Sequence, residues 1–406
     1  MSTRKPIDVL IAGAGPVGLT MGLALKRFAP ELKVAINDIR ALDVPKDERS
    51  SALALGVTSV FEALGIWDKM LPTSAPIRGM HITDSDETDL MRPLFLKFEG
   101  DVKPGQPFAH MVPNTTTIGV LMEEAQKVGI EFFAPVKVEK IHNRESVSQI
   151  TFDNGEQLDA TLVIAADGAR SQLRDMAGIK TFGHDYGQSG IVCTFAHEID
   201  HDQIAYEHFL PSGPFATLPL PNSRSSLVWS EKTERVQSFL DLDKAQIERE
   251  IEKRSGATLG KVTIEGPVQA FPLKLQIAKS FYGERLALIG DAAHVVHPIA
   301  GQGMNLGLKD VAALAEVIVD ALRLGEDIGG ETVLQRYEKW RRVDIGLMVV
   351  ATEGLNRLFS NNLPPLRALR DVGLGVVDRL EPLKKAFIGH AAAASGGPKL
   401  LNGRPI

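Results

Sequence analysis

The stretch from Arg285 to Ala312 contains residue types that could bind a flat, negatively charged ligand. Its apolar beginning, Arg285–Gly290, has the length and composition of a strand buried on both faces, and Asp291 stands where that strand would end. The next residues allow the backbone to turn tightly and to lie close against a planar group that larger side chains would hold away. The residues with this property are Pro298, Gly301 and Gly303.

A long helix is predicted directly after this loop. Apolar residues recur at helical spacing from about Met304 to Leu324. The first N–H groups of a helix have no partner inside it, so a negative charge placed there gains roughly 0.3–1 kcal/mol when exposed and more when buried. The Gly290-Asp291 pair alone would fit an ordinary strand-to-helix connection with an acidic cap, whereas the whole stretch indicates a binding site.

A second candidate site lies near the start of the chain. A predicted strand, Asp8–Ala12, is followed by a GxGxxG pattern and by a predicted helix over Leu19–Phe28. In this pattern the first glycine makes a tight turn, the second lets backbone approach a pyrophosphate, and the third packs helix on strand. The next predicted strand is Lys33–Ile36, and Asp38 closes it, 25 residues after the first glycine, where a carboxylate can accept hydrogen bonds from a ribose. Capping of a turn is the alternative role of this carboxylate. The glycines are Gly13, Gly15 and Gly18.

A third stretch has the same character, because a predicted buried strand, Thr161–Ala165, is followed by ADGARS over Ala166–Ser171. Together the three stretches resemble the flavin monooxygenases of the para-hydroxybenzoate hydroxylase family, most closely the branch that hydroxylates ubiquinone precursors. In that family GDAAHxxHPxAGQGxNxGL is nearly a signature, and here it runs from Gly290 to Leu308. The resemblance covers nearly the whole chain.

The resemblance implies an FAD site built from all three stretches. It assigns the ribityl chain or adjoining ribose to Asp291, the phosphate region to Asp167 and Gly168, and a docking place for the nicotinamide cofactor to the side of Arg170. It also places an arginine, here Arg49, on the phosphate or sugar region, with a surface ion pair as the alternative. The residues expected to shape the loop or to line the isoalloxazine are Gly290, Pro298, Gly301, Gly303, Met304 and Asn305.

The pattern predicts an α/β fold in three parts. A Rossmann-like FAD-binding domain would be assembled from residues 1–75, 105–180 and 270–345. Residues 76–104 and 181–269 would form an inserted substrate domain, in which short strands between Pro- and Asn-containing turns predict an antiparallel sheet. The best candidates for substrate contacts in that sheet, for which core packing is an equal explanation, are Phe209, Phe215 and Leu218.

Composition limits the classes of partner and chemistry. The 406 residues include 45 Lys and Arg against 51 Asp and Glu, a net charge of −6, so we expect no nucleic-acid partner. Cys193 is the one cysteine, which excludes an internal disulfide and a redox cysteine pair. His294 and His297 lack further ligands at metal-binding spacing, so we expect structural hydrogen bonds from them and no metal site. With no signal peptide and no apolar run of about 18 residues, a cytoplasmic protein is expected.

Residues 346–406 are predicted to be a helical C-terminal region with an apolar, mildly basic stripe. Between Val350 and His390 six Lys or Arg oppose four Asp or Glu, which leaves +2. Such a stripe could touch the inner face of a membrane or a partner in a biosynthetic complex, and packing within the chain is the commoner use. Ala391–Ile406 is expected to be mobile. The apolar residues of the stripe are Leu355, Leu358, Phe359, Leu363, Leu366, Leu369, Leu374, Val377, Leu380 and Phe387.

The family resemblance also implies a function. NADH or NADPH would reduce FAD transiently, O2 would form a flavin C4a-hydroperoxide, and one oxygen atom would pass to an activated phenol ring. The resulting interpretation is an FAD-dependent monooxygenase that hydroxylates a polyprenylated phenol in ubiquinone biosynthesis. Two alternatives stay open: the same mechanism on a small soluble aromatic such as a hydroxybenzoate or salicylate, and a flavoprotein component of a biosynthetic complex with little turnover. No base for the phenol is assigned, and the residues placed nearest the chemistry are His297, Pro298, Gly301 and Gly303.

Overall fold

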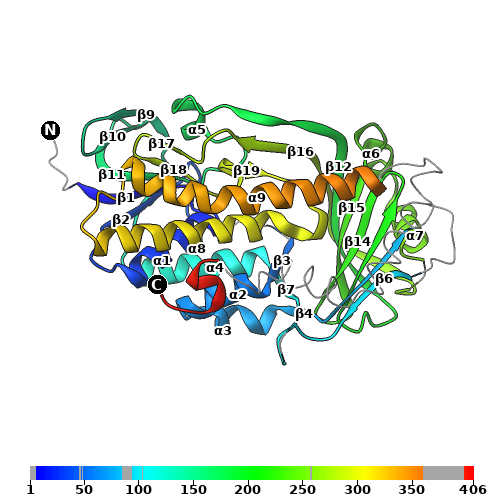
Figure 1. Ribbon diagram of the computed structural model, residues 1–406. Helices are drawn as coiled ribbons and strands as arrows, with labels where there is room; N and C mark the ends of the chain where they lie inside the picture. Colours follow the sequence, from blue (N-terminus) through cyan, green and yellow to red (C-terminus); the bar gives the residue numbers. More distant parts are fainter. Residues whose placement is uncertain are drawn as a thin grey trace.

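The computed structural model describes residues 6–44, 47, 49–84, 94–102, 104–256, 258–359 and 397–406. Two eight-stranded sheets and one three-stranded sheet lie within this part of the chain, and the long helices lie along the first sheet (Figure 1). The α/β class expected from the sequence is confirmed.

The first sheet is parallel at its centre, as a Rossmann-like sheet is. Its strands are β1 (Ile7–Ala12), β2 (Val34–Asn37), β8 (Glu131–Phe133), β9 (Val138–Asn143), β10 (Ser148–Phe152), β11 (Gln157–Ala165), β17 (Tyr282–Gly283) and β18 (Leu286–Leu288). β1 pairs in parallel with β11 and β2, β11 pairs in parallel with β18, and β2 with β8. β9, β10 and β17 pair antiparallel at the margins. The central strands are mostly apolar and buried, as expected of strands with both faces covered.

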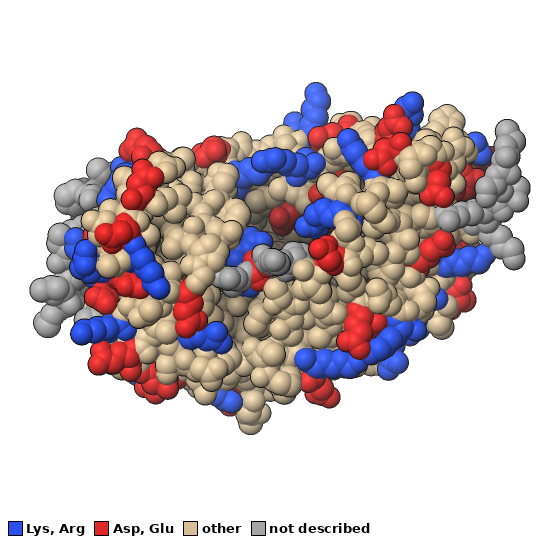
Figure 2. All heavy atoms as spheres, turned by 180° about the vertical axis from the view of Figure 1, so that it is seen from behind, with Lys and Arg blue, Asp and Glu red and all other residues tan. Residues whose placement is uncertain are grey.

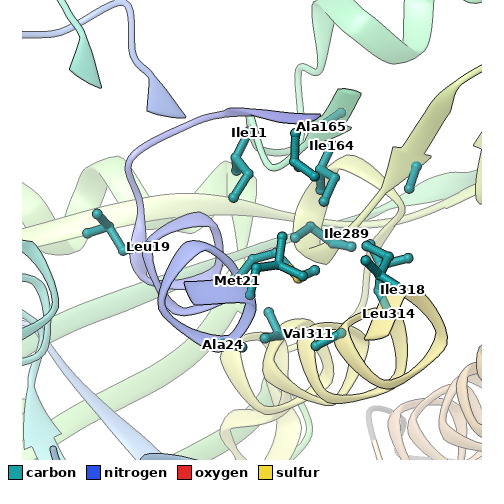
Figure 3. Packing of buried hydrophobic residues seen from close by; sticks show 14 of the residues in the cluster. Ile11, Leu19, Met21, Ala24, Ile164, Ala165, Ile289, Val311, Leu314 and Ile318 are labelled. Carbon is teal, nitrogen blue, oxygen red and sulfur yellow. The ribbon is translucent and has the colours of Figure 1, made fainter. Parts of the chain in front are cut away.

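Helices complete the core around this sheet. They are α1 (Pro16–Phe28), α2 (Leu55–Leu64), α3 (Trp67–Met70), α4 (Asn114–Lys127), α5 (Gln172–Met176), α8 (Gln302–Arg323) and α9 (Glu331–Phe359), with the 3₁₀ turns η1 (Leu71–Thr73), η2 (Gly290–Ala292), η3 (Ile299–Gly301) and η4 (Lys399–Asn402). Figure 3 shows Met21 of α1 and Val311 and Leu314 of α8 meeting below Ile11 and Ile164 of the sheet. α8 is buried almost all round, which is typical of a helix in the middle of a large core.

The second sheet forms the other end of the molecule. Its strands are β5 (Gly79–Asp84), β6 (Leu94–Glu99), β12 (Thr181–His197), β13 (Ile204–Leu210), β14 (Gly213–Leu220), β15 (Arg224–Lys232), β16 (Val262–Ala278) and β19 (His294–Val295). Every pairing in it is antiparallel except that of β5 with β13, so the sheet is mixed rather than purely antiparallel. β5 follows directly after β4 (Ala75–Ile77), near residue 80, and pairs with β13, which comes about 125 residues later in the chain. α6 (Thr233–Leu240) and α7 (Lys244–Ser255) cover one face, and the other face is left for the cavity.

Two long strands connect the two ends of the molecule. β12 and β16 are each 17 residues long and pair with each other over most of their length. The first half of β12, Thr181–Gln188, is largely exposed and is held as a strand by its pairing with β16. Gly183, with φ +150°, lies where the strands press together, since a Cβ there would stand 1.9 Å from the carbonyl oxygen of Leu275.

A three-stranded sheet, β3 (Ser50–Ala54), β7 (Ala109–Pro113) and β4 (Ala75–Ile77), lies between the two larger ones. α9 is a single helix that passes residue 345 without interruption and runs beside α8 toward the second sheet (Figure 1). The apolar stripe expected beyond it falls on residues 360–396, outside the described residues, as do the side chains of Leu355, Leu358 and Phe359. Within the part of the chain that the structure describes, no helix is long and apolar enough to cross a membrane.

The last ten residues are docked on the core, so the prediction of a mobile tail is wrong for residues 397–406. Leu400 and Leu401 of η4 are buried between α2 and α8. The backbone N–H of Lys399 donates to Glu316 at 2.8 Å, and Arg323 donates to the carbonyl of Ile406 at 3.0 Å. Two adjacent leucines thus anchor a segment whose other residues looked like a free end.

Candidate cofactor and substrate site

A cavity of about 1340 Å³ lies between the two larger sheets. One end is formed by the loops that follow β1, β2 and β18, and the other by the inner faces of β5 and β12–β16. Figure 2 shows a hollow near the middle of one face of the molecule, with Lys and Arg side chains at its rim. Because pockets for single small ligands usually have about 300–1000 Å³, this cavity has room for a dinucleotide and a second molecule.

The structure brings most of the predicted site residues to this cavity. The predicted residues that line it are Gly15, Asp38, Arg49, Gly168, Gly290, Asp291, Pro298, Gly301, Gly303, Met304, Asn305, Phe209 and Leu218. The predicted residues that do not line it are Gly13, Gly18, Asp167, Arg170, His297 and Phe215.

The three glycines of the first motif have different surroundings. Gly13 has φ +115°, and a Cβ there would stand 2.3 Å from the carbonyl oxygen of Ala166. A Cβ on Gly18 would stand 2.0 Å from the carbonyl oxygen of Gly13, so both glycines are required by close backbone packing. Around Gly15 no protein atom lies within 4 Å of that position, and the start of α1 has no side-chain cap. Unpaired N–H groups of α1 therefore face the cavity at a point open to a ligand.

Asp38 joins the end of β2 to this loop. Its Oδ2 accepts a hydrogen bond of 2.8 Å from the N–H of Ala14, and its Oδ1 accepts one of 2.8 Å from the N–H of Arg40. The carboxylate is nearly buried yet borders the cavity. It therefore fixes the glycine loop, and it also lies where a ribose hydroxyl could reach it.

Arg49 is held at the cavity wall by an ion pair. Its guanidinium donates two hydrogen bonds of 2.8 Å to Asp47, which also accepts one of 3.0 Å from Asn114. The guanidinium lies 5.0 Å from the ring centroid of Phe271 on β16. Burial opposes ionisation of Asp47, but the hydrogen bonds from Arg49 and Asn114 outweigh it and lower its pKa. The pair links a cofactor-side loop to a strand of the second sheet.

Asp291 presents a carboxylate to the cavity at the end of β18. Its side chain is exposed to the cavity and makes no hydrogen bond with another described residue. The surrounding protein still desolvates it enough to raise its pKa. Gly290, before it, takes φ +60°, which turns the chain so that the aspartate faces the ligand space.

The loop before α8 is open where a planar group would lie. Gly301 has φ +62° and precedes a helix start without a side-chain cap, and around Gly303 no protein atom lies within 4 Å of the Cβ position. Asn305 borders the cavity, as expected, and it also connects two elements. Its amide accepts from the N–H of Ala54 at 2.9 Å and donates to the carbonyl of Ala52 at 2.8 Å, so its side chain joins β3 to α8.

A buried ionic cluster behind this loop was not predicted from the sequence. Asp310 on α8 accepts hydrogen bonds from the N–H of Gly290 at 2.8 Å, from Arg341 on α9 at 2.7 Å, and pairs with His294 at 2.7 Å. All three side chains are buried, so the hydrogen bond expected of His294 is present. Burial acts to raise the pKa of Asp310, but His294 and Arg341 lower it overall. The only sequence signal was a charged residue, Asp310, inside an apolar helix.

The Asp-Gly motif contributes backbone rather than its charged side chains. Gly168 borders the cavity, but the carboxylate of Asp167 accepts hydrogen bonds from the N–H groups of Gln172 and Leu173 at 2.9 and 3.3 Å. It thus helps Ser171, the N-cap residue, to cap α5. Burial raises the pKa of Asp167. Arg170 is exposed on the surface outside the cavity.

His297 lies behind the loop and is fully buried. Neither ring nitrogen has a hydrogen-bond partner among the described residues, and its ring meets that of Tyr186 edge-on at 4.9 Å. Burial lowers the pKa of His297 to about 4, so its imidazole is neutral near pH 7. The hydrogen bond expected from this histidine is not made to any described residue.

Side chains alternate between the two faces of the second sheet, and only those on one face form the roof of the cavity. Phe209 of β13 and Leu218 of β14 face the cavity. Phe215 faces the other side, in the core beneath α6 and α7, where its ring centroid lies 6.0 Å from that of Trp229. Glu207, two residues before Phe209, also lines the cavity and is only 6% exposed. Sequence reasoning missed it because a single acid in a strand is usually solvated.

These features fit FAD. Two helix starts without side-chain caps, those of α1 and α8, border one continuous cavity, and each can hold a negative charge. Gly15 and Gly303 leave the adjoining space open, while Asp38 and Asp291 supply carboxylates for sugar hydroxyls.

Comparison with known proteins agrees with this geometry. A family model described as FAD binding domain matches residues 6–350. The whole chain is 39% identical to the ubiquinone hydroxylase UbiL of Rhodospirillum rubrum and covers 95% of it. It is 34% identical to the 3-demethoxyubiquinol 3-hydroxylase of Escherichia coli, with 96% of this chain and 99% of that protein aligned.

Solved structures show the same fold at lower identity. The p-nitrophenol 4-monooxygenase PnpA of Pseudomonas putida superposes with a TM-score of 0.79 over 99% of this chain and 100% of that one, at 18% identity. The chain therefore belongs to the FAD binding domain family, in the group that contains these ubiquinone hydroxylases, and FAD is its cofactor.

Proposed function

We propose that this protein hydroxylates the ring of a polyprenylated phenol in ubiquinone biosynthesis, using NADH or NADPH and O2. The names of its relatives support the reaction and the pathway. FAD, when bound, supplies the redox chemistry that activates O2 for transfer of one oxygen atom to the ring. The protein has to hold the cofactor, orient the ring and exclude water.

The observation that carries the choice of substrate is the polarity of the cavity roof. Among the described residues that line the cavity, the cations are Arg40 and Arg49, and both lie on cofactor-side loops in contact with Asp38 and Asp47. The described residues of the sheet side offer mostly apolar side chains, a single acid, Glu207, and no cation. The neutral polar residues there are Tyr206, Ser226, Ser230 and Gln269. An anionic hydroxybenzoate would need a cationic partner there, whereas a neutral phenol with an apolar tail would not.

We further infer the roles of the cofactor-binding residues. Gly15 and the start of α1 hold the pyrophosphate, Asp38 the adenosine ribose, and Asp291 the ribityl chain. The backbone at the start of α8, around Gly303, stabilises negative charge on the reduced ring. The exposed Arg170 serves the transient docking of the nicotinamide cofactor.

We also infer a peripheral contact with the inner face of the membrane, since a polyprenyl tail resides there. The apolar and basic residues of the C-terminal region 346–406 are the candidates for this contact. Flotation of the full chain with vesicles containing anionic lipid should recover the protein, and charge reversal at Lys384 and Lys385 should reduce that recovery. Equal recovery of the wild-type protein and the charge-reversal variant would mean that these basic residues do not bind the membrane and that the apolar stripe packs within the chain.

The experiment that tests the proposed function compares substrates with purified yellow protein. A prenylated phenol in detergent and soluble hydroxybenzoates are each supplied with NAD(P)H, and both NAD(P)H consumption and product mass are measured. Coupled hydroxylation of the prenylated phenol alone is the expected result. Hydroxylation of the soluble acids would contradict the substrate class while keeping the reaction.

A further inference from the structure

Glu207 is a buried acid that faces the cavity without a partner. It lies on β13, and because side chains alternate along a strand, it shares the cavity face with Ala205 and Phe209. Only 6% of the residue is exposed, and its carboxylate makes no hydrogen bond or ion pair with another described residue. Buried carboxylates in proteins are normally paired, so one that points unpaired into a ligand cavity indicates a partner on the ligand.

The surroundings of Glu207 are apolar. Its cross-strand neighbours are Ala216 on β14 and Ile82 on β5, and both line the cavity. This burial raises the pKa of Glu207 to about 7, so the carboxyl group can both accept and return a proton near neutral pH.

Other titratable groups on β13 and its neighbours are engaged elsewhere. His208 pairs with Thr83 at 2.7 Å on the opposite face of the sheet. His81 on β5 lies 3.1 Å from Glu99 on β6, and its ring contacts that of Tyr206. On the cavity side, the charged groups are those of the cofactor loops, and Glu207 is the one acid among the described residues of the roof. Tyr206 also borders the cavity, but burial raises the pKa of its hydroxyl, so it stays neutral near pH 7.

The position of Glu207 relative to the cofactor loop follows from contacts along β13. Ala205 packs in a small apolar cluster that includes Ile77 and Ala52. Ala52 in turn lies 3.4 Å from the Cβ position of Gly301 in the loop before α8. Glu207 is two residues further along the strand, about 7 Å from Ala205. An aromatic ring between the cofactor loop and the roof would therefore meet this carboxylate at its edge.

We propose that Glu207 binds the phenolic hydroxyl of the substrate and takes its proton during hydroxylation. This inference rests on the proposed function, since it requires a phenol. The O–H bond of the phenol breaks, its proton moves to the carboxylate, and the electron pair stays on the oxygen as phenolate. The phenolate increases electron density at the ring carbon that receives the oxygen atom. That carbon then loses its own proton to the second oxygen atom of O2, which leaves as water, and the ring becomes aromatic again. Glu207 returns the first proton to the phenolate, so the proton balance at this residue is zero.

The test uses the FAD-loaded full chain with the E207Q variant, which keeps the shape of the side chain but cannot take a proton. E265Q is the matched control, because Glu265 is an exposed glutamate on β16 outside the cavity. With a prenylated phenol in detergent, we expect E207Q to lower the hydroxylation rate by about 100-fold or more while FAD content and substrate affinity change little. The wild-type rate should rise as the pH passes about 7, and E207Q should lose that rise.

A second variant separates proton transfer from simple packing. E207D keeps the carboxylate on a shorter side chain and should recover part of the rate and the pH dependence. If E207Q and E265Q both work within two-fold of wild type with the same pH profile, Glu207 has no such role. If the wild-type protein hydroxylates no prenylated phenol at all, the proposed function fails, and this inference fails with it.

Discussion

The carboxylate of Asp291 can be removed without breaking a hydrogen bond to any described residue, which makes it the sharpest probe of the FAD site. With FAD removed from both proteins, we expect D291A to melt at the wild-type temperature. It should bind FAD about 10–100-fold more weakly, since hydrogen bonds to a charged group contribute about 1.5–3 kcal/mol. The ratio of flavin absorbance to protein absorbance after desalting measures this directly. Full FAD occupancy in D291A would refute the role given to Asp291.

Asp167 provides the contrasting control for that experiment. Its carboxylate accepts hydrogen bonds from the N–H groups of Gln172 and Leu173 and helps to cap α5 rather than facing the cavity. Loss of such a cap costs about 0.5–2 kcal/mol of stability. D167A should therefore lower the melting temperature while retaining more FAD than D291A.

Glu207 should also leave a signature in the pH dependence of stability. Its pKa rises from 4.5 in the unfolded chain to about 7 in the folded protein, so the folded protein binds more protons between these values. Folding stability must then fall as pH rises from about 4.5 to about 7, by about 3 kcal/mol in total. E207Q removes this loss, so it should be more stable than wild type at pH 8 and close to it at pH 4.5. Urea unfolding of both proteins at several pH values gives the difference, and a constant difference across pH would contradict it.

At the residue scale, the cofactor loops could be predicted and the roof of the cavity could not. A glycine that must make a turn and an aspartate that closes a strand have local sequence signals. Phe215 and Leu218 differ by three positions, so a regular strand cannot place both on one face, and parity alone shows that one of them is core. The face of the sheet that borders the cavity is the one that α6 and α7 leave uncovered, and the local sequence does not show which face that is. For the same reason Glu207 could not be assigned to the cavity from the sequence.

At the element scale, the buried cluster around Asp310 joins η2, β19, α8 and α9. We expect D310A to lower the free energy of unfolding by about 3–5 kcal/mol, because Arg341 is left buried without its partner on α8. FAD binding should weaken as well, since Asp310 holds the N–H of Gly290 beside Asp291. D320A, on the exposed face of the same helix, should change stability by less than about 0.5 kcal/mol. Urea unfolding measures both variants, and a loss below about 1 kcal/mol in D310A would show that the cluster does not stabilise the fold in this way.

Elements with a clear period were predictable, and those stabilised by distant contacts were not. β1, α1 and α8 have apolar runs or apolar residues at helical spacing, and such a pattern identifies the element whichever part of the chain packs against it. The first half of β12 is polar and exists as a strand because β16 pairs with it. The docked tail depends on two leucines, Leu400 and Leu401, meeting a groove between α2 and α8, and nothing in the local sequence shows that groove.

At the scale of the whole molecule, the cavity is formed jointly by the loops of the first sheet and by the inner face of the second sheet. β12 and β16 pass continuously from the cofactor side to the sheet that forms the roof (Figure 1). α9 contacts β17 of the first sheet and β14 of the second. Arg49 on a cofactor-side loop lies against Phe271 of the roof. These connections predict that the two sheets unfold together and that a ligand bound at one end stabilises the other.

Tryptophan fluorescence can test this coupling, because Trp67 is buried in the core cluster that includes the first sheet and Trp229 in the core of the second. The variant W67F/W340F leaves only Trp229 as a reporter, and W229F/W340F leaves only Trp67. Each variant is unfolded with urea after removal of FAD and again with FAD at about 100 times its dissociation constant. Mass action then adds about 2.7 kcal/mol to the stability of whatever unfolds with the FAD site. If the molecule is one cooperative unit, both reporters shift to higher urea by the same free energy. A shift of Trp67 with none of Trp229 would mean that the roof unfolds independently of the FAD site, so FAD binding would add nothing to the stability of the sheet that faces the substrate.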